Sequence, residues 1–204
     1  MIDYGDKILN TSRDLFFKFG LRSVTMDDIS RELCMSKKTL YQQYSSKNDL
    51  INTLTSKFFI HFETHYNKVV ENSKDAIDEL LLLMEDFRQV MERMDKRIIY
   101  DMQRFFPETL KKVRQHKQEF MLKKIVANLE KGIAQGIYRH NINIPIISQL
   151  RLEEIQLAID PDIFPPGKFE LDHIHNVLLL HYLHGIVTLK GRKLINKYLK
   201  IEED

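Results

Sequence analysis

The chain has 204 residues, of which 43% are hydrophobic and 29% charged, and its 31 Lys and Arg residues against 29 Asp and Glu residues give a net charge of +2. With 7 Gly and 5 Pro residues, this composition excludes collagen-like and disordered proteins and fits a globular chain long enough to bury one large core, or a small and a large one. A charge this close to zero argues against a protein that coats nucleic acid by bulk charge, but it allows a small basic surface on a neutral body.

Four helices are predicted in the first part of the chain. Apolar residues at helical spacing predict the first over 8–19. Thr25, which is followed by acids in the next turn, and Ser36 are predicted N-caps of two short helices, the second over 37–44. A polar break at 45–49 opens a long fourth helix.

The predicted helices lengthen further along the chain. Apolar stripes predict helices over 77–94, 107–136 and 144–159, and a last long one over 169–189. Gly191 is expected to separate that helix from a short terminal one. Since no segment alternates as a strand does, the predicted class is all-α.

Cysteine usage and hydropathy indicate the compartment. The single cysteine, Cys34, excludes an intrachain disulfide. Residues 1–10 carry acids where a secretory signal needs a basic region, and the most apolar stretch, 177–189, is shorter than the roughly 20 residues of a membrane span. We therefore expect a cytoplasmic protein.

The two short helices, joined near Cys34, form a candidate helix-turn-helix. The second helix exposes Lys, Thr and Gln side chains, which suit phosphates and base edges, while Leu40 and Tyr44 can face inward. From Ser36 to Lys57 there are four basic residues and one acid, a local charge of 4 − 1 = +3. On these residues alone, DNA binding and an ordinary charged helical surface both stay open.

A set of residue types recurs in this region at fixed spacing: Leu15-Phe16, Gly20, Thr25-Met26, Ile29-Ser30, Ser36, Leu40-Tyr41, Tyr44 and Lys47-x-Asp49-Leu50. In order and spacing it resembles the N-terminal module of the TetR (tetracycline-repressor-like) transcriptional regulators, over about residues 5–52. The rest of the chain is similar to that family only in helical character and length. The resemblance implies a three-helix DNA-binding domain (1–47) joined by a long fourth helix to a larger helical ligand-binding and dimerisation domain (48–204).

The resemblance also implies which residues contact DNA. Thr25 and Ser36 would bind phosphate besides capping their helices, and Tyr41 and Lys47 would contact the DNA backbone. The implied DNA-binding residues are Thr25, Ser36, Lys37, Lys38, Thr39, Tyr41, Gln42 and Lys47. Cys34 departs from the pattern, because the family has glycine in this turn. A left-handed backbone costs another residue about 1–2 kcal/mol, so the turn is expected to be either slightly strained or differently wound. We expect the thiol to be buried and inert rather than a redox sensor.

A homodimer and a ligand cavity are implied for the second domain. The last two long helices would pair with their mates as a four-helix bundle, through Ile174, Val177, Leu178, His181, Gly185 and Leu189, although packing within one subunit stays an alternative. The cavity would take an apolar or amphipathic molecule. Its candidate lining residues, which at this spacing also suit an ordinary core, are Phe62, Tyr66, Met84, Phe87, Met91, Tyr100, Phe105 and Phe120.

Other features give weaker signals. His173, His175, His181 and His184 are close in sequence, but no Cys or acid stands beside them at ligand spacing, so we predict no metal and no cofactor. Residues 96–124 carry nine basic and three acidic residues, which predicts a solvated face, with a second DNA contact or an anionic ligand as the alternative. The sequence shows no nucleophile–base pair, phosphate loop or paired carboxylates, so no enzyme is expected.

The predicted function follows from these features. The chain would be a dimeric, ligand-responsive transcriptional regulator, a repressor that binds a palindromic double-stranded DNA operator through its third helix and is released by a small apolar or amphipathic molecule. The alternative is a regulator of the same fold that a protein partner controls, or that has no small ligand.

Overall fold

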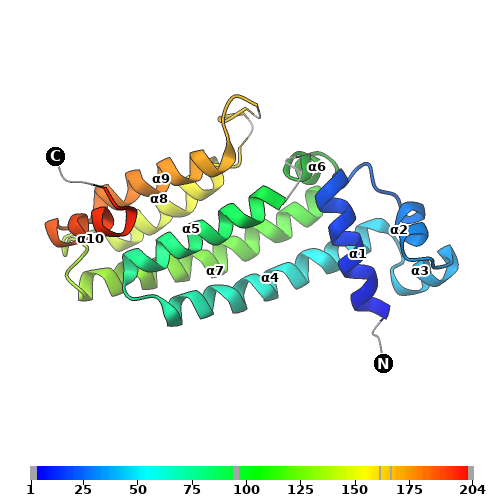
Figure 1. Cartoon of the computed structure of the whole chain (residues 1–204), viewed down its shortest axis with the longest axis horizontal. Helices are drawn as coiled ribbons and strands as arrows, with labels where there is room; N and C mark the ends of the chain where they lie inside the picture. Colours follow the sequence, from blue (N-terminus) through cyan, green and yellow to red (C-terminus); the bar gives the residue numbers. More distant parts are fainter. Residues whose placement is uncertain (1–3, 94–96, 161, 166, 202–204) are drawn as a thin grey trace. The chain divides into compact units, whose positions relative to one another are not determined.

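A computed structural model describes residues 4–93, 97–160, 162–165 and 167–201, without the side chains of Met91, Ile99 and Lys117. The described residues form ten α-helices: α1 (Tyr4–Phe19), α2 (Met26–Glu32), α3 (Lys37–Gln43), α4 (Lys47–Asn72), α5 (Ala76–Arg93), α6 (Arg97–Phe105), α7 (Pro107–Ala134), α8 (Ile144–Leu157), α9 (Leu171–Ile186) and α10 (Leu189–Leu199) (Figure 1). The all-α prediction is confirmed. Within the described ranges, no helix combines the length and apolar character needed to cross a membrane.

The chain folds as two compact units that cut across three helices. The first unit consists of residues 1–65 and 90–114, and the second of residues 66–89 and 115–204. The first unit therefore contains α6, and parts of α4, α5 and α7, in addition to the predicted helix-turn-helix. As functional domains, the predicted ranges 1–47 and 48–204 stay a prediction.

The first unit is built around the apolar faces of its short helices. Ile8 and Phe16 of α1, Ile29 of α2 and Leu40 of α3 are buried in one cluster with Leu50 of α4. Ile8 and Phe16 are eight positions apart, about two helical turns, so α1 turns one side inward. Packing α1, α2 and α3 in this way fixes which side of α3 faces solvent.

The second unit has an apolar core with a buried polar network inside it. The core joins Ile77, Leu129, Leu152 and Leu183 among others. Inside it, the Asn128 amide donates to the Ala76 carbonyl at 3.0 Å and to the Glu79 carboxylate at 2.9 Å. The Lys131 ammonium lies 2.8 Å from the other Glu79 oxygen.

Tyr138 completes this network. Its hydroxyl lies 3.1 Å from both the Ala76 carbonyl and the Asn128 amide oxygen. Its ring fills the space over Gly132, where an added Cβ would stand 2.0 Å from a ring carbon. Burial raises the pKa of the Tyr138 hydroxyl well above its usual value, so this group is a neutral, structural hydrogen-bond partner.

The C-terminal helices begin and end differently from the prediction. The predicted long helix over 169–189 corresponds to α9, which ends at Ile186, and the Thr188 hydroxyl then caps α10 by accepting from the Gly191 N–H at 3.2 Å. Gly191 therefore lies inside α10 and does not separate two helices. Its role is a close approach, because a Cβ at this position would stand 2.2 Å from the Ile137 carbonyl oxygen.

Candidate DNA-binding site

The solvent side of α3 carries a continuous polar surface. Lys37, Lys38, Thr39, Tyr41 and Gln42 are all exposed, and 47% of the Tyr41 surface is accessible. On the opposite side of the helix, Leu40 and Tyr44 are buried, as their spacing predicted. Alternation of inward anchors with outward polar groups holds the polar row on one rigid element, which is the arrangement of a helix that reads a DNA groove.

Both predicted N-caps are present. The Ser36 hydroxyl accepts from the Thr39 N–H at 3.1 Å and lies 2.8 Å from the Thr39 hydroxyl. The Thr25 hydroxyl accepts from the Asp28 N–H at 3.2 Å and donates to the Asp28 carboxylate at 2.6 Å, which makes a reciprocal capping box with the Thr25 N–H. The Thr25 hydroxyl therefore already donates its proton to Asp28. To donate to a phosphate, it would have to give up this hydrogen bond.

The capping box predicts an acid-sensitive contribution to stability. Hydrogen bonds from the Thr25 hydroxyl and backbone N–H lower the pKa of the Asp28 carboxyl from its usual value. A carboxyl with a lower pKa in the folded chain stabilises it above the unfolded-state value, near 4, and this contribution is lost as pH falls through the folded-state pKa. We expect the stability advantage of wild type over Asp28→Asn to shrink between about pH 6 and about pH 3.

Thermal unfolding of both proteins across that range measures the effect. Asp14→Asn is the control, because Asp14 is an exposed aspartate of the same unit outside the capping box. An advantage of wild type over Asp28→Asn that stays constant with pH would contradict the prediction.

The three predicted phosphate-binding lysines differ in their surroundings. The Lys37 ammonium lies 2.5 Å from the Asp27 carboxylate. Lys47 is half-buried, donates to the Arg22 carbonyl at 3.3 Å and lies over the Phe16 ring, and burial lowers its pKa. Lys38 is exposed and forms no ion pair with any residue that the structure describes. Lys38 is thus ready for a phosphate, whereas Lys37 and Lys47 must exchange a partner for one.

Cys34 occupies a left-handed turn, which the sequence had left open, and its thiol is exposed rather than buried. Its φ is 51°, the Met35 N–H donates to the Ser30 carbonyl at 2.9 Å, and the Cys34 N–H donates to the Arg31 carbonyl at 3.1 Å. This pair of bonds is the Schellman arrangement that ends a helix and favours glycine at the left-handed position. The prediction of a buried thiol was wrong because the tight turn places the side chain outside the helix pair.

A residue that the sequence did not single out also organises this unit. Asp101 of α6 is buried and accepts from the Arg22 N–H at 2.8 Å, and the Arg22 guanidinium lies 4.9 Å from the centre of the Phe105 ring. Asp101 and Phe105 are four residues apart, so one face of α6 holds the turn that enters α2. Phe105 was predicted to line a ligand cavity, but its ring is partly exposed against Arg22.

The other predicted ligand-binding residues are divided between the two units. Tyr66 is buried with its ring edge-on to Phe120 at 5.6 Å, and the Phe87 ring lies 4.1 Å from that of His175. Tyr66, Phe87, Phe120 and Met84 belong to the second unit, whereas Phe62, Tyr100 and Phe105 belong to the first. The Met91 side chain lies outside the described residues. Ligand contact stays a prediction for all eight residues.

The predicted dimer face is partly present. On α9, Val177, His181 and Gly185 are exposed and Leu178 is half-buried, whereas Ile174 is 6% exposed and packs beside His175 on the inner side of the helix. Ile174 therefore does not lie on this face. Leu189 is exposed but starts α10, so it does not continue the α9 surface.

The sequence reasoning missed the apolar surface of α8. Ile146, Leu150 and Leu157 are exposed at spacings of four and seven residues, which places them on one side of the helix. α8 and α9 lie side by side (Figure 1). The spacing of these residues is visible in the sequence. However, when a helix is apolar on two sides, the sequence does not show which side is covered by its own subunit.

The part of the chain that the structure describes contains no evident metal centre. Among the residues that the structure describes, no three His, Cys, Asp or Glu side chains are grouped so as to hold a metal ion. Of the four clustered histidines, His175 is buried against Phe87, and His173, His181 and His184 are exposed.

Taken together, a capped helix-turn-helix with a polar α3 surface, carried on an all-α body, defines the class of helix-turn-helix DNA-binding regulators. Residues 8–54 match the family model of bacterial regulatory proteins of the tetR family. Over these residues the chain is similar to the TetR family of transcriptional regulators, which supports a DNA-binding regulator.

Individual proteins are similar to this chain in sequence or structure over most of its length. The HTH-type transcriptional repressor KstR2 of Mycolicibacterium smegmatis is 21% identical over 198 residues, 92% of this chain and 93% of the relative. A TetR transcription regulator from Haloarcula marismortui has a similar structure, with a TM-score of 0.73 and 17% identity over 90% of this chain and 98% of that one. The regulator FadR from Bacillus subtilis, solved with stearoyl-CoA, has a TM-score of 0.64 and 16% identity over 89% of this chain and 98% of its own.

Proposed function

We propose that this DNA-binding regulator is a cytoplasmic repressor that binds a palindromic operator as a homodimer, through α3 of each subunit, and is released by a small molecule. The observation that carries the proposal is the polar row on α3, anchored from behind by Leu40 and Tyr44. The residues proposed to contact DNA are Thr25, Ser36, Lys37, Lys38, Thr39, Tyr41, Gln42 and Lys47. The name of the Mycolicibacterium relative supports repression rather than activation.

Operator binding should depend steeply on salt. If Lys37, Lys38 and Lys47 of both subunits meet phosphates, six counterions are released, and log K should fall with log salt with a slope of about −5. Fluorescence anisotropy with the upstream intergenic DNA, over a series of salt concentrations, measures this slope. Absent binding, or binding insensitive to salt, would remove the repressor hypothesis.

The apolar surface of α8 and α9 supports the homodimer. Ile146, Leu150 and Leu157 of α8 and Val177 of α9 expose apolar area that would be costly to leave in water. Two copies that pair these helices would bury it in a two-fold interface, in which the same patch serves both subunits.

A charge in this surface tests the dimer. Leu150, which is 51% exposed, does not hold its own subunit together, so Leu150→Glu should give a folded monomer at micromolar concentration where wild type is a dimer. Sedimentation velocity measures the change. Leu82→Glu is the matched control, since Leu82 is an exposed leucine on α5, and it should leave the dimer intact. A wild-type monomer, or equal loss of the dimer in both variants, would contradict the assignment.

The small-molecule effector is supported by two aromatic ring pairs of the second unit, Tyr66 with Phe120 and Phe87 with His175. Tyr66, Phe87 and Phe120 make ring contacts inside that unit, which suits an apolar or amphipathic ligand. The Bacillus subtilis neighbour, which shares the fold, was solved with stearoyl-CoA. Control by a protein partner is the alternative. If the small-molecule fraction of a cell extract releases the operator DNA and the protein fraction does not, this alternative is contradicted.

A further inference from the structure

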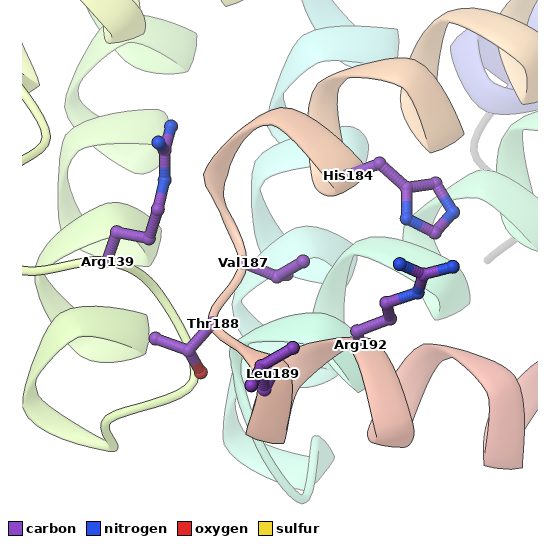
Figure 2. Close-up of a pocket in the computed structure, with 6 residues that line it drawn as sticks. All are labelled: Arg139, His184, Val187, Thr188, Leu189 and Arg192. Atoms are coloured by element: carbon purple, nitrogen blue, oxygen red, sulfur yellow. The ribbon is translucent and has the colours of Figure 1, made fainter.

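A cavity lies at the elbow where α9 ends and α10 begins. Its volume is about 680 Å³, and it is lined by Arg139, His184, Val187, Thr188, Leu189 and Arg192. Figure 2 shows the His184 ring and the Arg192 guanidinium pointing toward one another, with Arg139 on the other side of Val187. The lining thus contains two guanidinium groups and an imidazole but no carboxylate.

Neither of these two arginines has an acidic partner among the described residues, unlike several other arginines of the chain. Arg31, Arg88 and Arg151 each lie against a nearby carboxylate. Among the described residues, no carboxylate forms an ion pair with Arg139 or Arg192. Arg139 donates to the Gly185 carbonyl at the end of α9, which uses only part of its donor capacity. Most guanidinium donors of this cavity are therefore available to a ligand.

The walls of the cavity are held in place by backbone hydrogen bonds between distant segments. The Arg139 N–H donates to the Ile186 carbonyl at 2.9 Å, and the Thr188 N–H donates to the Ile137 carbonyl at 2.9 Å. The Thr188 hydroxyl adds a bond to the Gly136 carbonyl at 3.0 Å. Since these bonds fix the backbone before any ligand arrives, binding needs little ordering of the site.

The chemistry of the lining selects the ligand. Guanidinium groups match carboxylate and phosphate oxygens geometrically, whereas they repel a cation and give an uncharged molecule only weaker hydrogen bonds. Val187 and Leu189 add apolar surface, and Leu189 is 80% exposed. Leu189 also borders a neighbouring cavity of about 470 Å³ whose lysines, which raise the local positive potential, are Lys190, Lys193 and Lys197.

We propose that the α9–α10 elbow is a binding site for a small organic anion that carries a carboxylate or phosphate group and an apolar chain. Arg139 and Arg192 would bind the oxyanion from two sides, His184 would add a donor, and Val187 and Leu189 would contact the chain. None of the residues predicted to line the effector cavity belongs to this site, and the proposal does not depend on DNA binding.

The test uses the full-length, ¹⁵N-labelled protein and three probes with the same chain: octanoate, octyl phosphate and 1-octanol. Both anions, or one of them, should shift the backbone amide signals of residues 187–192, and 1-octanol should not. Preference for octanoate or for octyl phosphate identifies the oxyanion. Equal binding of 1-octanol, or shifts confined to other regions, would overturn the proposal.

Variants test the assignment to the arginines. Arg192→Gln leaves the bond between Arg139 and α9 in place, so it should fold normally and weaken anion binding by about tenfold, in keeping with the loss of one hydrogen-bonded charge. Arg139→Gln should add to this loss, and Arg114→Gln, at an exposed arginine of α7, should have no effect. Unchanged affinity in Arg192→Gln refutes the site.

The acidic side chains of a second subunit are the competing occupant. In that case no probe would bind the dimer, and Arg192→Gln would weaken dimerisation in sedimentation velocity. That pair of results would overturn the proposal of a small-molecule site while leaving the operator-binding proposal untouched.

Discussion

Lys131→Met is expected to lower the free energy of unfolding by about 3 kcal/mol, because it leaves a buried carboxylate without its cation. Glu79 is 2% exposed, and its two oxygens are bound by Lys131 and Asn128. The cost of desolvating an ionised carboxyl is several kcal/mol and is offset here by the ammonium 2.8 Å away. The lysine side chain is 29% exposed, so water can compensate part of the loss, which places the estimate at the low end for a buried pair.

Two further variants separate the ion pair from simple loss of a lysine. Lys123→Met, at an exposed lysine of the same helix, should change stability by less than about 0.5 kcal/mol. Glu79→Gln keeps a hydrogen-bond acceptor for Asn128 and removes the charge, so adding it to Lys131→Met should recover part of the loss. Urea unfolding of the four proteins completes the double-mutant cycle. A double variant no more stable than Lys131→Met would show that the network, and not the charge pair, is responsible.

The local signals of the sequence were sufficient to predict the helix-turn-helix. Thr25 and Ser36 were identified as caps, and Leu40 and Tyr44 as inward-facing, because capping and helical periodicity act over four residues or fewer. The same local reasoning left open whether Cys34 takes the left-handed position or winds the turn differently. It failed for the thiol's exposure, which depends on how the two helices meet and not on the residues of the turn.

The parts that could not be predicted are pairings between distant positions. Asp101 accepts from the Arg22 N–H across 79 residues, and Lys131 reaches Glu79 across 52. No local pattern marks either partner, since an isolated acid on a helix usually faces water. The surface of α8 was missed for a related reason, because Leu150 and Leu152 are alike in sequence while one is exposed and the other buried.

Gly191, just after the end of α9, shows that a glycine needed for close packing can be mistaken in the sequence for a helix terminator. Gly191 was interpreted as a separator, since glycine is a common helix terminator. In the structure it lies in the first turn of α10, where the absence of a Cβ lets the helix approach the Ile137 carbonyl. The prediction therefore placed a helix boundary at Gly191, whereas α10 begins at Leu189.

Tyr41→Ala is expected to weaken operator binding by at least about 100-fold without unfolding the protein. Its exposed phenol projects from α3 beside the lysines and is proposed to hydrogen-bond a phosphate. Such a bond to a charged group contributes about 1.5–3 kcal/mol, and a two-fold dimer makes it twice. Since the phenol is largely outside the core, thermal stability should change by less than about 0.5 kcal/mol.

Control variants identify what Tyr41 does. Tyr41→Phe should lose as much affinity as Tyr41→Ala if the hydroxyl is the contact, and Tyr4→Ala, at an exposed tyrosine of α1, should lose none. A phosphate contact carries no sequence information, so Tyr41→Ala should weaken operator and random DNA by the same factor, whereas Gln42→Ala should weaken the operator more. Anisotropy titrations against both DNAs measure these ratios. A loss at Tyr41 that is restricted to the operator would instead place the ring against bases and contradict the phosphate contact.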